Sequence, residues 1–306
     1  MQHDGNSRLH ALPARAAAGL LLALALGSAA AQVPATAAAA AAAGPDDRYD
    51  RDKVLRVCQD PNNLPLSDRE GRGFENRIAE LLAGKLGWKV EHTWYPQRMG
   101  FIRNTLRAKL PDSDQYKCDL VTGVSTDFEM GLTTRPYYHS TYALAYVKGR
   151  GLDDVSTPED LARLPPERRQ KLRIGAFART PAVDWLLNNG LIDQMVSYQH
   201  QTGDPDQYPG QVIERDLASG ALDAAIAWGP IVGYFAKKAD AAPIAVLPFM
   251  PPDKNGVRFD FSIAMAVRHG DKALRDRING LIDSSRPEIE AVLKEYGVPL
   301  LPLEQK

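Results

Sequence analysis

The sequence predicts an α/β fold of two lobes, each a mostly parallel sheet flanked by helices, joined by a hinge of two strands. Three observations predict it. Between residues 53 and 123, short apolar runs alternate with helical patterns, the order typical of parallel sheets covered by helices. The alternation restarts after residue 149, and a further strand pattern at 261–268 follows it. We therefore expect a first lobe, a second lobe and a return of the chain to the first.

The first lobe begins with the strand pattern VLRVC at 54–58. A helix should follow from Phe74, because apolar residues recur at helical spacing and Gly87 supplies a C-terminal stop. The remaining elements predicted here are the strand KVEHTW (89–94), the helix GFIRNTLRAKL (100–110) and the strand CDLVTG (118–123).

The second lobe repeats the alternation from 160 to 240. Its predicted strands are LRIGAF (172–177), MVSYQ (195–199) and LDAAIAW (222–228), with helices at 160–165, 180–191, 208–220 and 230–240. The chain then returns through IAVLPF (244–249), and two helices close it from Lys272 onward. With crossings near 146–149 and 246–249, lobe 1 comprises residues 49–147 and 248–306, and lobe 2 comprises residues 148–247.

The N-terminus carries the three parts of a secretory signal peptide. Arg8 and Arg15 precede an apolar run at 16–29, which is too short to span a bilayer as a mature helix, and small residues follow it. We expect residues 1–31 to be a signal peptide cleaved near Ala31, residues 32–48 to be an Ala-rich disordered tether, and the folded body to lie in the periplasm without membrane insertion.

Composition and motifs exclude several classes of function. Lys and Arg number 37 against 38 Asp and Glu, with no basic block, so nucleic acid is not an expected partner. The histidines form no HExxH pair, and the chain has no G-x-S-x-G, Walker or G-x-G-x-x-G motif. We therefore expect no metal site, no cofactor and no enzymatic activity.

Polar and aromatic residues gather where the predicted strands end. Because the carboxyl ends of parallel strands meet at one edge of a sheet, five such loops could line a cleft between the lobes. Each residue also has an ordinary structural explanation, as a turn former, a helix cap or a solvated charge. The candidates are Asp60, Asn62, Asn63, Gln97, Arg98, Ser125, Thr126, Arg179, Thr180 and Trp228.

Four tyrosines precede the predicted hinge in the run RPYYHSTYALAY, which spans 135–146. Aromatic side chains at this place either line the mouth of the cleft or pack in the core, and the sequence leaves both open. Tyr138 is included among the cleft candidates.

Several segments resemble one family. They are LRVCQDPNNLPLS (55–67), GFENRIAELLAGKLG (73–87), WYPQRMGFIRNTL (94–106), CDLVTGV (118–124), TTRPYYHSTYALAY (133–146) and AIAWGPIVGYFA (225–236). The chain resembles, from about residue 53 to 300, the MxaJ/XoxJ family: periplasmic proteins of the type II solute-binding fold encoded beside PQQ-dependent methanol dehydrogenases.

The resemblance implies a binding role without the anchors of amino-acid receptors. In the wider family of those receptors, an arginine binds the ligand carboxylate and an aspartate binds its ammonium group. This chain has Thr126 or Asp127 at the place of the arginine and Trp228 at the place of the aspartate. Burying either charge without a partner costs several kcal/mol, roughly a thousandfold in affinity. A free amino acid is therefore not the expected ligand.

The chain has two cysteines, Cys58 and Cys118, and export allows a disulfide between them. In the implied fold, Cys58 ends its strand and Cys118 begins the neighbouring one. A parallel register would leave them about 10 Å apart, too far for a bond unless the register shifts, so the sequence leaves this disulfide open.

Two functions follow as expectations. The first is an accessory protein that binds a PQQ-dependent methanol or alcohol dehydrogenase and assists its maturation or activation. The alternative is the substrate-binding protein of an ABC transporter for a small neutral polar solute, which rests on the two-lobed architecture alone.

Overall fold

The computed structural model describes residues 45–199, 204, 206–240, 242–250 and 256–303. The predicted signal peptide and most of the predicted tether lie outside these residues. Within the range of the tether, helix α1 (Pro45–Asp52) begins at Pro45. Tyr49 is 2% exposed, so the packed body includes this helix.

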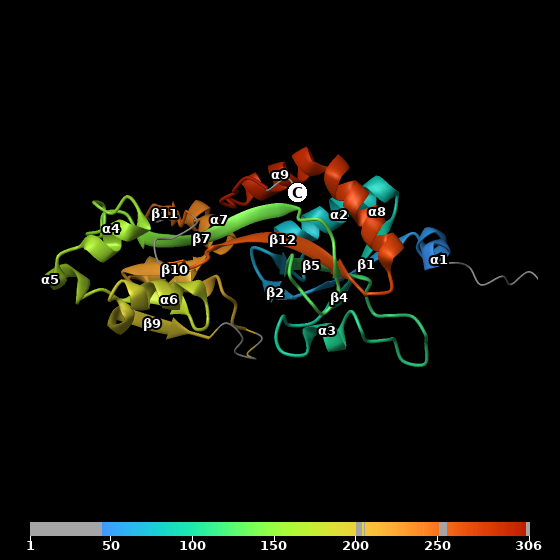
Figure 1. The fold of residues 1–306 in the computed structure, drawn as a ribbon, viewed down its shortest axis with the longest axis horizontal. Helices are drawn as coiled ribbons and strands as arrows, with labels where there is room; N and C mark the ends of the chain where they lie inside the picture. Colours follow the sequence, from blue (N-terminus) through green and yellow to red (C-terminus); the bar gives the residue numbers. More distant parts are fainter. Residues whose placement is uncertain (1–44, 200–203, 205, 241, 251–255, 304–306) are drawn as a thin grey trace, which may run out of the picture. The chain divides into compact units, whose positions relative to one another are not determined.

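The first group of strands forms a mostly parallel sheet (Figure 1). β1 pairs in parallel with β4 on one side and with β5 on the other, whereas β12 runs antiparallel to β5. The strands of this group are β1 (Val54–Gln59), β4 (Lys89–Trp94), β5 (Leu120–Ser125), β6 (Leu132–Thr133) and β12 (Asp260–Val267), with the small ladder β2 (Asn62–Asn63) and β3 (Ser67–Asp68) beside them.

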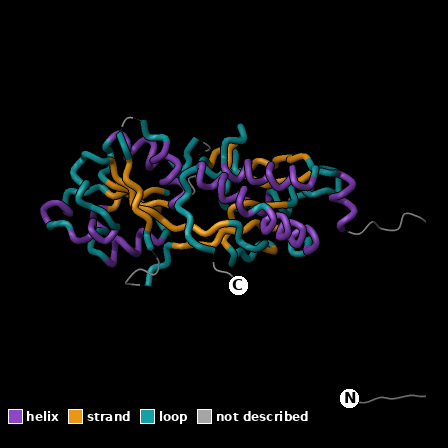
Figure 2. Tube along the Cα trace, turned by 90° about the horizontal axis from the view of Figure 1, so that it is seen from above, coloured by secondary structure: helices purple, strands orange, loops and turns teal. Residues whose placement is uncertain are grey.

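The second group has the same plan. β8 pairs in parallel with β9 and β10, and β11 runs antiparallel to β7 (Tyr138–Val147). Its strands are β8 (Ile174–Phe177), β9 (Met195–Tyr198), β10 (Ala224–Trp228) and β11 (Ile244–Pro248). Figure 2 shows the helices packed around the two groups of strands.

The long strand β7 (Tyr138–Val147) connects the two groups. Its first residues, up to Thr141, pair with β12, and from Tyr142 onward it pairs with β10 and β11. The chain returns between β11 and β12. The protein therefore has the predicted two-lobed α/β fold, with β7 as the strand that belongs to both lobes. β7 changes partners a few residues before position 147, where the sequence analysis placed the end of the first lobe segment.

Three helices of the first lobe, α2, α8 and α9, lie where the sequence predicts them. α2 (Phe74–Leu86) buries Phe74, Ile78 and Leu82, and Gly87 ends it in the left-handed conformation at φ 68°. The phenyl ring of Phe74 meets the ring of Tyr138 edge-to-face at 5.9 Å. α8 (Lys272–Ser284) and α9 (Arg286–Glu295) pack against α2, confirming two closing helices after Lys272.

Two predicted helices differ from expectation. The helix expected at 100–110 is only α3 (Phe101–Asn104), because the side chains of Asn104 and Thr105 bond back to the carbonyls of Gly100 and Phe101. The helix expected at 208–220 is largely the π-helix η2 (Val212–Leu217).

The remaining helices belong to the second lobe. They are α4 (Pro158–Arg163), α5 (Pro166–Arg169), α6 (Pro181–Asn188), the short η1 (Ile192–Gln194) and α7 (Gly229–Lys237). The core beneath them contains Trp185, whose ring meets that of Phe249 edge-to-face at 5.3 Å. Among the described helices, none combines the length and the apolar character that crossing a bilayer requires.

Cys58 and Cys118 form a disulfide, with 5.5 Å between their Cα atoms, so the expected separation of about 10 Å is wrong. Cys58 pairs with Val121 of β5, but Cys118 lies before β5 begins. The carbonyl of the preceding residue, Lys117, accepts a hydrogen bond from Thr93, the residue of β4 that pairs with Cys58. The segment that contains Cys118 therefore crosses over the strands to reach Cys58, and does not run parallel to them as part of β5.

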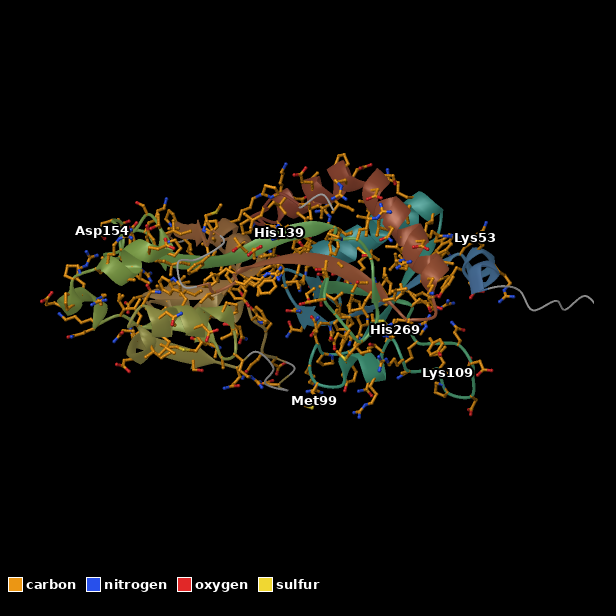
Figure 3. The ribbon with its side chains drawn as sticks, in the orientation of Figure 1. Lys53, Met99, Lys109, His139, Asp154 and His269 are labelled. Carbon is orange, nitrogen blue, oxygen red and sulfur yellow. A yellow bond between two sulfur atoms is a disulfide. The ribbon has the colours of Figure 1, made fainter. Side chains whose placement is uncertain are left out.

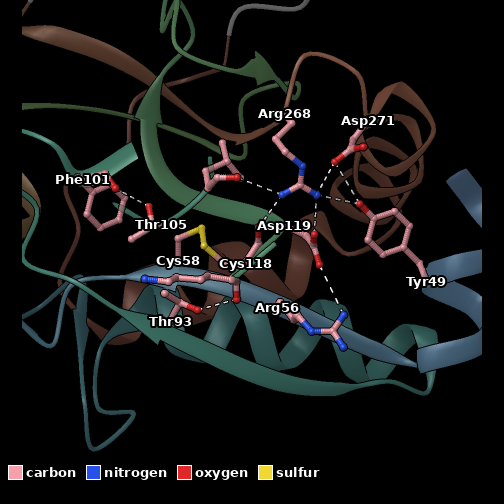
Figure 4. Close-up of a disulfide and its surroundings, with 12 residues drawn as sticks. Tyr49, Arg56, Cys58, Thr93, Phe101, Thr105, Cys118, Asp119, Arg268 and Asp271 are labelled. Atoms are coloured by element: carbon pink, nitrogen blue, oxygen red, sulfur yellow. Dashed lines mark hydrogen bonds and ion pairs between the residues drawn. A yellow bond between two sulfur atoms is a disulfide. The ribbon is translucent and has the colours of Figure 1, made fainter. Parts of the chain in front are cut away.

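Arg268 fixes the same segment (Figure 4). Its guanidinium donates to the carbonyl of Cys118 at 2.6 Å and to the carboxylate of Asp119 at 2.5 Å. Burial would lower the pKa of Arg268, but the negative charges of Asp119 and Asp271 raise it above its usual value. Arg268 stays charged and holds the disulfide segment on the sheet.

Candidate functional site

A cavity of about 120 Å³ lies between loops of the two lobes. The first lobe contributes the loops that follow β1 and β4, and the second lobe contributes the ends of β8 and β9 and the chain leading into η2. The lining residues are Asp60, Asn62, Asn63, Pro96, Gln97, Arg98, Phe177, Tyr198, Gln199, Asp204, Gln207, Tyr208, Pro209, Gln211 and Val212.

The wall from the first lobe is polar and held together by Asp60. One carboxylate oxygen accepts the backbone N–H of Asn62 at 2.8 Å, and the other accepts the backbone N–H of Gln97 at 2.5 Å. The amide of Asn63 also donates to the side-chain oxygen of Gln97 at 3.1 Å. The two loops therefore form one rigid unit, in which the Asp60 carboxylate has a structural task.

The wall from the second lobe combines aromatic rings with amide side chains. The hydroxyl of Tyr198 donates to Asp216 at 2.6 Å, and the hydroxyl of Tyr208 donates to Glu214. Burial, and then the carboxylate of Glu214, raise the pKa of Tyr208 to about 12, and burial raises the pKa of Tyr198 as well. Both phenols stay neutral, and both carboxylate partners belong to η2.

Amide side chains are the commonest polar groups of the lining. Each amide offers a donor and an acceptor, so this set can bond neutral polar groups, including the N–H and C=O of a peptide. The aromatic rings of the second-lobe wall can pack against apolar or planar parts of the same ligand. The amides are Asn62, Asn63, Gln97, Gln199, Gln207 and Gln211.

Five of the eleven residues predicted for the cleft line this cavity: Asp60, Asn62, Asn63, Gln97 and Arg98. They share one origin, since all of them follow β1 or β4. The loops that follow these two strands of the first lobe therefore lie at one cavity.

Four further candidates lie at other strand ends and are not among the described residues that line the cavity. Ser125 is the last residue of β5 and pairs with Ile263. The backbone N–H of Thr126 donates to the carbonyl of Ser262. Arg179 is exposed, with φ 61°, and the hydroxyl of Thr180 donates to the carbonyl of Phe177.

The two aromatic candidates belong to packed clusters. Tyr138 is 2% exposed, so it packs in the core, one of the two alternatives that the sequence left open. Trp228 ends β10 and is half-buried, with its ring edge-to-face against Tyr142 at 5.5 Å and Phe261 at 6.0 Å. Neither is among the described residues that line the cavity.

The second-lobe wall contains residues that the sequence analysis did not name, above all Tyr198, Gln199 and Tyr208. A signal was present for the first two. They end the predicted strand MVSYQ, so the rule that selected Asp60 and Gln97 also applies to them. Tyr208 lies in a loop before η2 and follows no strand, so that rule could not find it.

A buried polar network lies beside the first-lobe wall. The carboxyl of Glu75 accepts hydrogen bonds from Thr122 at 2.7 Å and Tyr137 at 3.1 Å. Thr122 in turn accepts from Gln59, which immediately precedes Asp60. Burial raises the pKa of Glu75 to about 7, although both hydroxyl donors act in the opposite direction. Within the described part of the chain, no three His, Cys, Asp or Glu side chains form a group that could hold a metal ion.

No family model matches the chain. Protein MoxJ of Methylorubrum extorquens is 30% identical over 264 residues, covering 82% of each chain. The crystal structure of the periplasmic binding protein XoxJ from Methylobacterium extorquens is 33% identical, with a TM-score of 0.64, and the match covers 81% of this chain and 100% of that one.

The crystal structure of MxaJ from Methylophaga aminisulfidivorans is 26% identical, with a TM-score of 0.65. This match covers 81% of this chain and 100% of that one. The similarity therefore extends over most of the sequence and over the fold. The chain belongs to the MxaJ/XoxJ family and has the fold of type II periplasmic binding proteins.

Proposed function

We propose that this protein is a periplasmic accessory protein that binds a PQQ-dependent methanol or alcohol dehydrogenase and assists its maturation or activation. The observation that carries the proposal is the match to MoxJ across 264 residues, which includes both walls of the cleft. Members of the family that the chain resembles are encoded beside such dehydrogenases, and we infer the partner from this. The protein itself acts as a binding protein and not as an enzyme.

The chemistry of the cleft supports a protein segment as its occupant. Amide groups bond peptide N–H and C=O groups equally well, and the aromatic wall receives apolar side chains. The lining carries Asp60, Asp204 and Arg98, but the carboxylate of Asp60 is committed to two backbone N–H groups. Recognition here rests mainly on neutral hydrogen bonds and ring contacts.

The same features disfavour a free amino acid. Thr126 or Asp127 stands where amino-acid receptors carry an arginine for the ligand carboxylate, and Trp228 stands where they carry an aspartate for the ammonium group. Neither charged anchor is present at these positions. Calorimetric titration with the standard amino acids should therefore give no binding in the micromolar range. A micromolar amino-acid ligand would contradict this part of the proposal.

We also propose that the protein is exported to the periplasm. The chain should be cleaved near Ala31, and mass spectrometry of the periplasmic fraction should find a mature N-terminus at or near Gln32. An intact N-terminus in the membrane fraction would contradict it.

Binding to purified dehydrogenase tests the function. The wild-type protein should bind with a measurable Kd, and a double variant Gln97→Ala and Gln211→Ala should bind at least ten-fold more weakly, because it removes one amide from each wall. Gln170→Ala is the matched control, since Gln170 is exposed and lies outside the described lining. Absence of wild-type binding would overturn the proposal.

A transport receptor for a small neutral polar solute is the second candidate. The small size of the cavity, about 120 Å³, and its six amides favour this alternative. Loss of uptake of one solute in a strain without the gene, with normal dehydrogenase activity, would select it.

A further inference from the structure

The strand order of the sheet has an edge strand at each end. β4 lies at one end and β9 at the other (Figure 1). β4 carries the exposed charges of Lys89 and Glu91, which discourage pairing with another strand. β9 reads Met-Val-Ser-Tyr and carries no charge, and its two central residues are exposed. Of these two edges, only the second lacks the usual protection against strand addition.

The backbone of β9 has a side that faces away from β8. The carbonyl of Tyr198 accepts the N–H of Ala178, which places the backbone groups of Tyr198 on the β8 side. Because backbone groups alternate along a strand, the N–H and C=O of Ser197 point to the opposite side. Among the described residues, no strand pairs with β9 on that side.

This edge leads into the cleft. Tyr198 and Gln199, at the carboxyl end of β9, line the cavity, while Val196 beside them is 36% exposed. Across the cavity, the loop after β4 presents Met99 with 91% of its surface exposed, at the outer edge of the loop before α3 (Figure 3). The approach to the cleft therefore combines an open backbone edge with exposed apolar side chains.

We propose that an extended segment of the partner protein adds to β9 as a further strand and continues into the cleft. This inference rests on the proposed function, and it specifies how that partner is held. Main-chain hydrogen bonds to Ser197 would supply binding independent of sequence, and the cleft's rings and amides would select the side chains that follow. A four-residue edge alone offers few hydrogen bonds, so it needs the adjoining cleft, which favours a partner segment over a second copy of this chain.

Ser197→Pro is the direct test. Proline removes the outward N–H of Ser197 but leaves the hydrogen bonds between β9 and β8, and edge strands tolerate it. We expect this variant to bind the purified dehydrogenase at least ten-fold more weakly than wild type. Ser197→Ala, which retains the N–H, should bind like wild type. Thermal unfolding of each variant checks that the fold is retained.

Val196→Lys is the second variant, because it adds to β9 the kind of charge that protects β4. It should also weaken binding at least ten-fold without a change in fold. If wild type binds the dehydrogenase and both folded variants bind equally well, strand addition is overturned while the proposed function stands. If wild type does not bind, both are overturned. If the variants lose only a self-association seen by gel filtration, β9 pairs with a second copy, and the proposal is wrong.

Discussion

The carboxylate of Asp60 accepts the backbone N–H of Gln97, which joins the loop after β1 to the loop after β4 across 37 residues of sequence. Its other oxygen accepts the N–H of Asn62. Together with the hydrogen bond from Asn63 to Gln97, this side chain holds the two loops of the first-lobe wall in place. A rigid wall lowers the entropy cost of binding, since these loops need not be ordered when the partner arrives.

Replacing Asp60 should loosen this wall. Asp60→Ala removes the acceptor of two backbone N–H groups, but the N–H of Gln97 is exposed and can bond water instead. The free energy of unfolding should therefore fall by roughly 0.5–1.5 kcal/mol. Binding to the dehydrogenase should weaken as well, with Asp60→Asn intermediate because its amide oxygen still accepts one hydrogen bond. Urea unfolding and a binding titration measure the two effects. Unchanged stability and affinity in Asp60→Ala would refute this role.

Glu75 should make stability depend on pH. Its pKa is about 7 in the folded protein against an ordinary value of 4.5, so the folded protein retains a proton that the unfolded chain releases. The free energy of unfolding should therefore fall as pH rises from about 4.5 to 7, by an amount on the order of 3 kcal/mol. Unfolding curves across this range measure it.

Glu75→Gln is the matched control, because glutamine has a similar shape and does not titrate. The difference in stability between the variant and wild type should grow in favour of the variant as pH rises from about 4.5 to 7. A constant difference across this range would show that the folded and unfolded proteins bind this proton equally.

The disulfide should contribute to stability. It closes a separation of 60 residues, and such a crosslink restricts the unfolded chain by about 4 kcal/mol. The double variant Cys58→Ala and Cys118→Ala should lose stability of this order, and a reducing agent should destabilise wild type but not the variant. Equal denaturation midpoints for the two proteins would contradict the expectation.

A glycine contact joins α7 to the chain after α9. A Cβ atom on Gly233 would lie 1.9 Å from the carbonyl oxygen of Gly297, so Gly233→Ala should destabilise the fold by on the order of 1–3 kcal/mol. A methyl group added to Gly84 in α2 would instead meet nothing within 4 Å, so Gly84→Ala should stabilise the fold by about 0.5–1 kcal/mol. Thermal unfolding of the two variants should shift in opposite directions; a shift in the same direction would be inconsistent with this contact.

Local sequence patterns predict a helix well when the residues that determine it all lie within or next to that helix. The apolar spacing from Phe74 and the stop at Gly87 both act within α2, so the sequence contains what determines it. The side chains of Asn104 and Thr105 compete with the helical backbone, and this competition ended α3 earlier than its apolar pattern suggested.

Tertiary geometry was harder to predict. The expected distance between Cys58 and Cys118 assumed that Cys118 lies within the register of β5, whereas its segment crosses the strands. At the site, the end of a strand predicted Asp60 and Gln97 but also selected Trp228, which packs against Tyr142 and Phe261. Whether a side chain at a strand end faces a cavity or a ring cluster depends on the opposite lobe, which a local pattern does not contain.

If the protein assists the maturation or activation of a dehydrogenase, that enzyme should be poorly active without it. The most direct measurement is PQQ-dependent dehydrogenase activity, with the amount of dehydrogenase protein, in the periplasm of a strain lacking the gene. We predict normal amounts of dehydrogenase with low activity, restored by adding the purified wild-type protein. Normal activity in that strain, together with no association between the two purified proteins, would contradict the account.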